Sequence, residues 1–306
     1  MIKKQVKETQ WQGKTSGGKL GQRFLFFVLA RIKVNYLYPI LYIIIPFYFI
    51  LGDKNCKIIY QYFRKRHNYS KLQSLKSTFF NYLLFGKVVL DKFALFAGNT
   101  AQFKVHIHQS EEATQKLQSS KGLILAGAHV GNFEIAALCL QIENKNISSV
   151  VYANEATILQ QKRKKTYLNL HLNLIEIQED MSHLIEIKKT LEAGNIISIS
   201  CDRLVGSYKK FTFDFLGKKA DFPSGIFYMS NLLNINMLSV FVMKGKSLHY
   251  HVYIEPLQQN NTQGNNEDKA KYLAQQYVGF LEKMLKKYPR QWFNYYNFWQ
   301  ENEDIR

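Results

Sequence analysis

The chain has 306 residues, and its 46% hydrophobic and 14% aromatic content excludes intrinsic disorder and allows one large domain or two modest ones. Three cysteines, none of them in a C-x-x-C pair, exclude a disulfide scaffold and a cysteine-rich zinc module. The formal net charge of +18 predicts an acidic partner, which is a nucleic acid, an anionic membrane surface or an acidic protein.

The basic residues are concentrated near the N-terminus. Residues 1–104 hold 18 basic and 3 acidic side chains, a net charge of +15, whereas the other 202 residues carry only +3. The basic side chains flank long apolar runs, which favours a membrane surface and argues against nucleic acid. We therefore predict two parts, a basic membrane-anchor region over 1–104 and a nearly neutral domain over 105–306.

Residues 34–51 form an apolar run of 18 positions without a charged side chain. A helix of this length is about 27 Å long, just short of the roughly 30 Å hydrocarbon core of a bilayer. Pro39 and Pro46 would kink it. The run predicts a membrane anchor, either spanning or half-inserted, and the alternative is a pair of buried core helices. A cleavable signal peptide is not expected, because the run starts late and no small-residue cleavage site follows.

Residues 54–104 alternate basic and apolar side chains at helical spacing. This pattern favours amphipathic helices lying on an anionic bilayer, where each basic residue adds roughly 1 kcal/mol. The alternative is a solvated helix face.

The second part of the chain, residues 105–306, has a pattern that predicts an α/β domain. Strands are predicted over residues 122–130, 148–152, 196–200, 211–215, 237–243 and 247–255, and helices over 131–140, 181–191, 224–233 and 268–287. Their alternation predicts a mixed, mostly parallel sheet flanked by helices, with its chemistry at the carboxyl ends of the strands. His106 and His108 alternate in a polar stretch that indicates an exposed edge strand.

The pattern H-x4-[D/E] occurs three times, as His106/Glu111, His129/Glu134 and His171/Glu176. Only His129 ends a buried strand and precedes the Gly-Asn start of a helix. If Glu134 lies in the first turns of that helix, it orients the imidazole and leaves the other ring nitrogen free to accept a proton. The alternative is a hydrogen-bonded structural histidine. Asp202 and Arg203 form a second polar cluster at a neighbouring strand end.

Four motifs in this order make the chain resemble a known family. They are His129/Glu134, Asp202-Arg203, the run Phe215-x-Gly217-x-x-Ala220 and Pro289-x-Gln291-Trp292. Together they resemble the late acyltransferases of lipid A biosynthesis, the lauroyl/myristoyl type, within the lysophospholipid acyltransferase superfamily. The resemblance covers roughly residues 120–300, and the N-terminal anchor fits the family layout.

The resemblance implies a membrane-associated acyltransferase that moves a fatty acyl chain from an acyl carrier protein or acyl-CoA to a hydroxyl of a lipid A-type precursor. His129 would be the base and Glu134 its orienter. Backbone N–H groups at Gly131 and Asn132 would stabilise the oxyanion or bind a phosphate.

Further expectations concern substrates and location. Asn132, Asp202 and Arg203 are predicted to bind substrate, as is Arg163, whose alternative is a solvated charge run. The expected partners are acyl carrier protein, the lipid acceptor and an anionic membrane, without nucleic acid. No cofactor or metal is expected, and the catalytic domain should lie on the cytoplasmic face of the inner membrane.

Several alternatives stay open at the level of sequence. Tyr152-Ala153 stands where lipid A enzymes often have Tyr-Arg, so the acceptor is either a lipid A precursor or another amino, hydroxy or phenolic lipid, or a glycerolipid. Cys201 offers a thiol-acyl intermediate. Five phenylalanines line an acyl groove or fill the core: Phe211, Phe213, Phe215, Phe222 and Phe227. The remaining alternative is a non-enzymatic protein that binds membrane surfaces through its basic residues.

Overall fold

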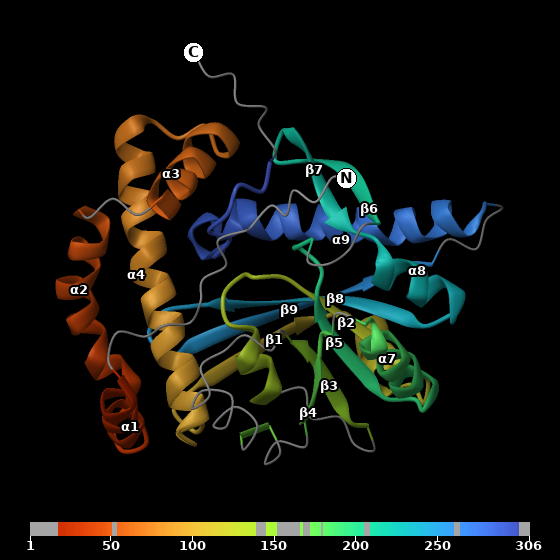
Figure 1. Ribbon diagram of the computed structural model, residues 1–306, viewed down its shortest axis with the longest axis horizontal. Coiled ribbons are helices and arrows are strands. Elements are labelled where there is room, and N and C mark those ends of the chain that lie inside the picture. Colours follow the sequence, from red (N-terminus) through yellow and green to blue (C-terminus); the bar gives the residue numbers. More distant parts are fainter. Residues whose placement is uncertain are drawn as a thin grey trace.

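A computed structural model describes residues 18–50, 54–138, 145–151, 166–167, 172–178, 180–204, 209–259 and 264–299. A large sheet lies at the centre, with helices on both of its faces (Figure 1). Its strands, in sheet order, are β1 (Lys104–Gln109), β9 (His249–Leu257), β8 (Asn236–Lys244), β2 (Leu123–Gly127), β5 (Ile196–Ser200), β3 (Ile147–Val151) and β4 (Leu172–Glu176). Only the β8–β9 pair is antiparallel. The predicted mixed, mostly parallel sheet is confirmed.

The helices form two layers, one on each face of the large sheet. Successive side chains of β2 pack alternately into one layer and the other. Leu123 and Leu125 pack with α1 (Gly18–Leu29), α2 (Tyr38–Ile50), α4 (Lys71–Phe96), α5 (Glu111–Gln118) and the 3₁₀ helix η2 (Phe133–Leu138). Ile124 and Ala126 pack with α3 (Lys54–Arg66), α7 (Ser182–Glu192), α8 (Gly225–Leu232), α9 (Asn266–Lys287) and the hairpin of β6 (Lys210–Phe215) and β7 (Lys218–Pro223). Two further 3₁₀ helices are η1 (Val34–Leu37) and η3 (Pro289–Gln291).

The helix predicted over residues 131–140 starts later than expected. Its described part is the 3₁₀ helix η2, which starts at Phe133. Gly131 still forms a bridge with Val242 of β8, and Asn132 donates its backbone N–H to the Val242 carbonyl. Pairing with the sheet therefore delays the start of the helix by two residues.

The apolar run at residues 34–51 does not form one continuous helix. It divides into η1 and α2, and among the described residues no helix is both long and apolar enough to cross a membrane. One face of α2 is buried in the core through Tyr38, Leu41 and Ile45, while the opposite face is exposed. The core-helix alternative therefore holds for one face, and a spanning anchor gains no support.

Helix α4 joins the N-terminal helices to the rest of the protein. It begins with a capping box between Ser70 and Gln73. Midway along it, the amide of Asn81 donates to the carbonyls of Arg290 and Trp292, at 3.0 and 3.1 Å. Because α1, α2 and α4 share one apolar cluster with the sheet, they pack as part of its covering layer. The boundary at residue 104 stays a prediction.

A buried ion pair lies where α4 meets the sheet. Asp91 of α4 and Lys244 of β8 are almost inaccessible, and Oδ2 of Asp91 lies 2.5 Å from Nζ of Lys244. The hydroxyls of Tyr38 and Tyr250 also donate to the Asp91 carboxylate, and Nζ of Lys244 donates to the carbonyl of Ser247 at 2.7 Å. These contacts, here called the Asp91 cluster, tie α2 and α4 to β8 and β9.

Candidate active site

The register of two parallel strands brings the candidate catalytic residues together. In the β2–β5 pair, Gly127 lies opposite Ser200. His129 and Asp202 each follow two residues later, so both leave the carboxyl edge of the sheet at the same level. Nδ1 of His129 lies 2.7 Å from Oδ1 of Asp202.

Asp202 is fully buried and holds His129 at two points. Its Oδ1 faces the imidazole, and its Oδ2 accepts the backbone N–H of His129 at 3.0 Å and the indole N–H of Trp292 at 3.3 Å. Burial alone raises the pKa of Asp202, but attraction to His129, the hydrogen bonds from His129 and the charge of Arg203 outweigh it and lower the pKa to about 2. Asp202 is therefore ionised at neutral pH and accepts a hydrogen bond from the N–H at Nδ1 of His129.

The imidazole of His129 presents its other nitrogen outward. Its side chain is 33% exposed, and within the described part of the chain Nε2 makes no hydrogen bond. Because Nδ1 carries the proton shared with Asp202, the neutral ring keeps a lone pair on Nε2. His129 can thus accept a proton from a substrate hydroxyl at Nε2.

Gly131 brings the chain after His129 against β8. Its φ is +53°, and a Cβ placed there would lie 1.8 Å from the carbonyl oxygen of Val242. No other residue fits this approach. Its N–H donates to Gln291, and that of Asn132 donates to Val242, both at 2.9 Å. The expectation that these two N–H groups bind an oxyanion or a phosphate is wrong, because both already donate to backbone carbonyls, one in η3 and one in β8.

The side chain of Glu134 belongs to a different group from that of His129. Oε1 of Glu134 lies 3.0 Å from Nζ of Lys92, and its Oε2 accepts a hydrogen bond from the hydroxyl of Tyr167. Glu134 lies on η2, which packs beneath α4, whereas the imidazole of His129 turns toward the end of β5. The structure therefore puts Asp202, and not Glu134, on the imidazole.

The segment after α9 closes the other side of the site. Phe293 donates its N–H to the carbonyl of His129 at 3.0 Å, and Tyr296 donates its hydroxyl to the carbonyl of Asp202 at 3.3 Å. Arg203 donates to the carbonyl of Phe293 at 3.2 Å, and its guanidinium lies over the ring of Tyr296. Arg203 therefore holds this segment in place. The sequence motif around Trp292 marked the segment, but its contact with Asp202 was not predicted.

Three predicted substrate-binding residues remain to be placed: Asn132, Arg163 and Asp202. Asn132 is 3% exposed, and its Nδ2 has no hydrogen-bond partner in the described structure. Arg163 lies outside the described residues. Asp202, expected to bind substrate, is buried behind His129.

The other chemical options find little support. Burial, followed by repulsion from Asp202, raises the pKa of the Cys201 thiol, so that thiol stays protonated and is a poor nucleophile. The phenylalanines considered for an acyl groove are all buried in the core cluster. The described residues contain no group of three or more His, Cys, Asp or Glu side chains arranged to hold a metal ion.

A histidine that is held by a buried carboxylate and keeps one ring nitrogen exposed, at the carboxyl edge of a mostly parallel sheet, is typical of α/β enzymes that activate a hydroxyl or a similar nucleophile. The model of the bacterial lipid A biosynthesis acyltransferase family matches residues 84–301, and the chain belongs to this family. The protein is therefore an acyltransferase, and the non-enzymatic alternative is wrong. Comparison with curated proteins gives no match.

Proposed function

We propose that this acyltransferase moves a fatty acyl chain from an acyl thioester to a hydroxyl of a lipid A-type precursor, with His129 as the base and Asp202 as its positioning residue. The observation that supports this most directly is the 2.7 Å contact between Nδ1 of His129 and Asp202, which leaves Nε2 free. Family membership supplies the reaction class.

The steps follow from this geometry. Nε2 of His129 removes the proton from the acceptor hydroxyl as its oxygen attacks the thioester carbonyl. The ionised Asp202 stabilises the imidazolium that forms. The tetrahedral intermediate then collapses, the carbon–sulfur bond breaks, and the imidazolium returns the proton to the leaving thiolate. No cofactor takes part in this scheme, and the donor is an acyl carrier protein or acyl-CoA.

Glu134 takes a different role in the proposal from the one expected from sequence. Its carboxylate holds Lys92 and Tyr167, on the face of the sheet that α4 covers. We assign it to positioning these two groups beside the site. Arg163 remains a proposed ligand of the acceptor head group.

The central experiment is a transfer assay with purified protein and lipid mass spectrometry of a deletion strain. Acyl carrier protein and CoA thioesters are offered separately with a lipid A precursor. We expect the wild type to add one chain to a hydroxyl, and His129→Gln to lose about 10²–10⁴-fold in rate. Full activity of His129→Gln would overturn the proposed base. Loss of an acyl chain from another amino, hydroxy or phenolic lipid in the deletion strain would replace the acceptor but keep the mechanism.

The proposed site of action is the cytoplasmic surface of the inner membrane. Helices α1 and α2 follow one another at one end of the molecule, and both pack against α4 (Figure 1). Their outward faces expose Phe24, Phe27, Ile40, Tyr42, Ile43, Ile44 and Phe47. The exposed basic side chains of Arg23, Arg31 and Lys33 lie in and just after α1. An apolar face beside basic residues is typical of a helix half-inserted into an anionic leaflet.

Vesicle flotation tests this membrane surface. The variant Phe24→Ser/Phe27→Ser/Ile43→Ser/Phe47→Ser should bind vesicles containing phosphatidylglycerol at least about tenfold more weakly than the wild type, because each buried apolar side chain contributes about 1.5–3 kcal/mol. Leu232→Ser is the matched control, since Leu232 is equally exposed at the end of α8. Equal binding by the two variants would refute the surface.

A further inference from the structure

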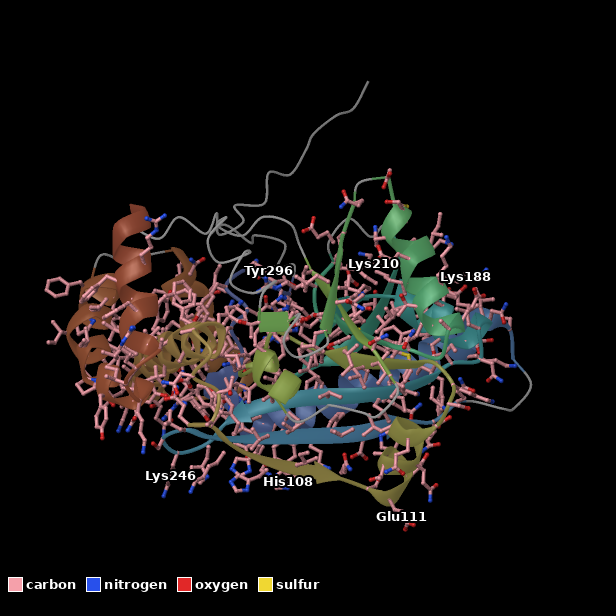
Figure 2. All side chains as sticks on the ribbon, turned by 90° about the horizontal axis from the view of Figure 1, so that it is seen from below. His108, Glu111, Lys188, Lys210, Lys246 and Tyr296 are labelled. Atoms are coloured by element: carbon pink, nitrogen blue, oxygen red, sulfur yellow. The ribbon has the colours of Figure 1, made fainter. Side chains whose placement is uncertain are left out.

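Two H-x-H pairs, 143 residues apart in the sequence, meet on the edge of the sheet. His106 and His108 lie on β1, and His249 and His251 lie on the parallel neighbour β9, where His106 is directly opposite His251. Since alternate residues of a strand share a face, all four imidazoles project from the same side of the sheet. His108 lies at the outer edge of the molecule (Figure 2).

The four rings lie side by side. Centroids lie 5.2 Å apart for His106 and His249, 5.1 Å for His106 and His251, and 5.2 Å for His108 and His251. The nitrogens pair across the strands, edge to edge. Nε2 of His106 lies 2.9 Å from Nδ1 of His249, and Nε2 of His108 lies 3.0 Å from Nδ1 of His251. These four side chains are here called the histidine ladder.

The spacing of the paired nitrogens suits a metal chelate. Two imidazole nitrogens at about 2.0–2.1 Å from a metal ion lie about 2.9 Å apart when they meet at a right angle, and about 3.3 Å apart at the tetrahedral angle. The two nitrogens of each pair point at each other, so each pair exchanges its shared hydrogen bond for a metal ion by turning both rings about their side-chain torsions until the ion lies beside the line that joins the nitrogens. The donor ring of the pair moves its proton to its other nitrogen through water and stays neutral, which is the form that binds metals.

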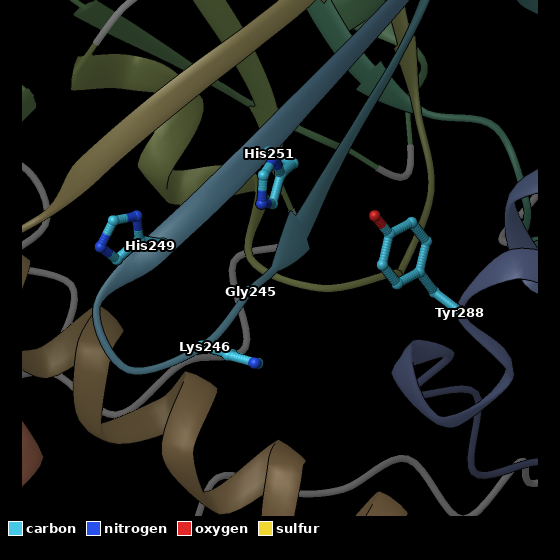
Figure 3. A pocket seen from close by; sticks show the side chains of 5 residues that line it. All are labelled: Gly245, Lys246, His249, His251 and Tyr288. Atoms are coloured by element: carbon cyan, nitrogen blue, oxygen red, sulfur yellow. The ribbon is translucent and has the colours of Figure 1, made fainter.

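We propose that the histidine ladder binds borderline divalent transition-metal ions such as Zn²⁺, Ni²⁺ or Cu²⁺, with each cross-strand pair supplying two imidazole ligands and water completing the coordination. His249 and His251 border a hollow of about 490 Å³, lined also by Gly245, Lys246 and Tyr288, which has room for coordinated water (Figure 3). Imidazole ligands select these ions over Mg²⁺ and Ca²⁺. The nearby Lys246 and Lys287 disfavour a bare cation, so the expected affinity is moderate.

Such a metal site would stabilise the edge of the sheet. Among the described strands β1 pairs with β9 alone, so a metal ion held by both strands would join this edge strand to that neighbour. The site is separate from the His129–Asp202 pair, because neither of those residues belongs to the ladder. The inference therefore does not depend on the proposed function.

The test uses the full chain without an affinity tag, titrated with ZnCl₂ and NiCl₂ by calorimetry after removal of metal with a chelator. We expect saturable binding, at least about tenfold weaker in His106→Asn/His249→Asn or in His108→Asn/His251→Asn. We also expect a rise in Tm on adding metal, which is absent when all four ladder histidines are changed to asparagine. His183→Asn on α7 is the control and should bind like the wild type. No saturable binding, or equal binding by the ladder variants, would overturn the proposal, and the second outcome would identify an adventitious ion only.

Discussion

Two buried aspartates in this protein lie in opposite settings. Asp202 lies at the end of β5 and faces His129, whose ring is one-third exposed and has a free Nε2. Asp91 lies on the face of α4 that packs against the sheet. Lys244, Tyr38 and Tyr250 surround its carboxylate, and all three side chains are buried. The burial of the two carboxylates is the same, so burial alone does not separate catalysis from structure.

The two aspartates differ in whether the residue paired with each one keeps a hydrogen-bonding group free. Nζ of Lys244 bonds to Asp91, to Tyr38 and to the carbonyl of Ser247, so its hydrogen-bonding capacity is satisfied inside the protein. His129 uses one nitrogen for Asp202 and turns the other toward solvent. A buried carboxylate therefore indicates a reactive site when its partner reaches the surface with an unused group.

The largest expected effect comes from converting Asp202 to asparagine. The new side-chain amide would donate to Nδ1 of His129 and force the ring proton onto Nε2, which removes the base. We expect the transfer rate of Asp202→Asn to fall by about 10²–10⁴-fold, with the far-ultraviolet circular dichroism unchanged. Glu134→Gln should lose about tenfold or less. A greater loss in Glu134→Gln than in Asp202→Asn would reverse the assignment of the two carboxylates.

The matching change in the Asp91 cluster should act on stability. Asp91→Asn leaves the ammonium of Lys244 buried without a counter-ion, which costs about 3–5 kcal/mol of unfolding free energy. Urea unfolding in detergent measures this loss, and the folded fraction should keep its transfer rate. Adding Lys244→Met should recover much of the stability. Loss of activity in correctly folded Asp91→Asn protein would show that the cluster serves the reaction.

Acid should remove the stabilising charge of Asp202. The pKa of Asp202 is lowered from an ordinary value of 3.8 to about 2, so its contribution is fully present above pH 4 and is lost as the pH falls toward 2. At 1.36 kcal/mol per pKa unit, this contribution is about 2 kcal/mol. Unfolding free energies of the wild type and Asp202→Asn should therefore converge between pH 4 and pH 2. Parallel curves over this range would contradict the lowered pKa.

The smallest expected effect concerns the indole of Trp292. Trp292→Phe removes the N–H that donates to Asp202 and should cost about 1 kcal/mol of stability and up to about tenfold in transfer rate. Trp299→Phe is the control, because its indole N–H donates to the carbonyl of Phe215 at 3.2 Å, away from Asp202. Equal rates in the two variants would show that Trp292 supports only the fold.

Local pattern determined much of the protein in advance. The apolar run that ends at His129 and the alternation of strands with helices predicted the sheet and its reactive edge, because side-chain periodicity follows local backbone geometry. The same reasoning placed Asp202 and Arg203 at a neighbouring strand end. His106 and His108 were correctly predicted to lie on an exposed edge strand.

Only the tertiary structure decided which of these residues meet. His129 pairs with Asp202, 73 residues away, because β2 and β5 are neighbours in register, and no spacing within one segment reports that. Glu134, nearer in sequence, turns to Lys92 on α4 instead. The apolar run that includes α2 predicts a spanning or half-inserted anchor or a pair of core helices, and only the fold shows that packing against α4 buries one face of α2. The order of the strands in the sheet likewise brings the two H-x-H pairs together. The side-chain periodicity of a strand depends on that strand alone, but the strands that pair with it depend on the whole chain.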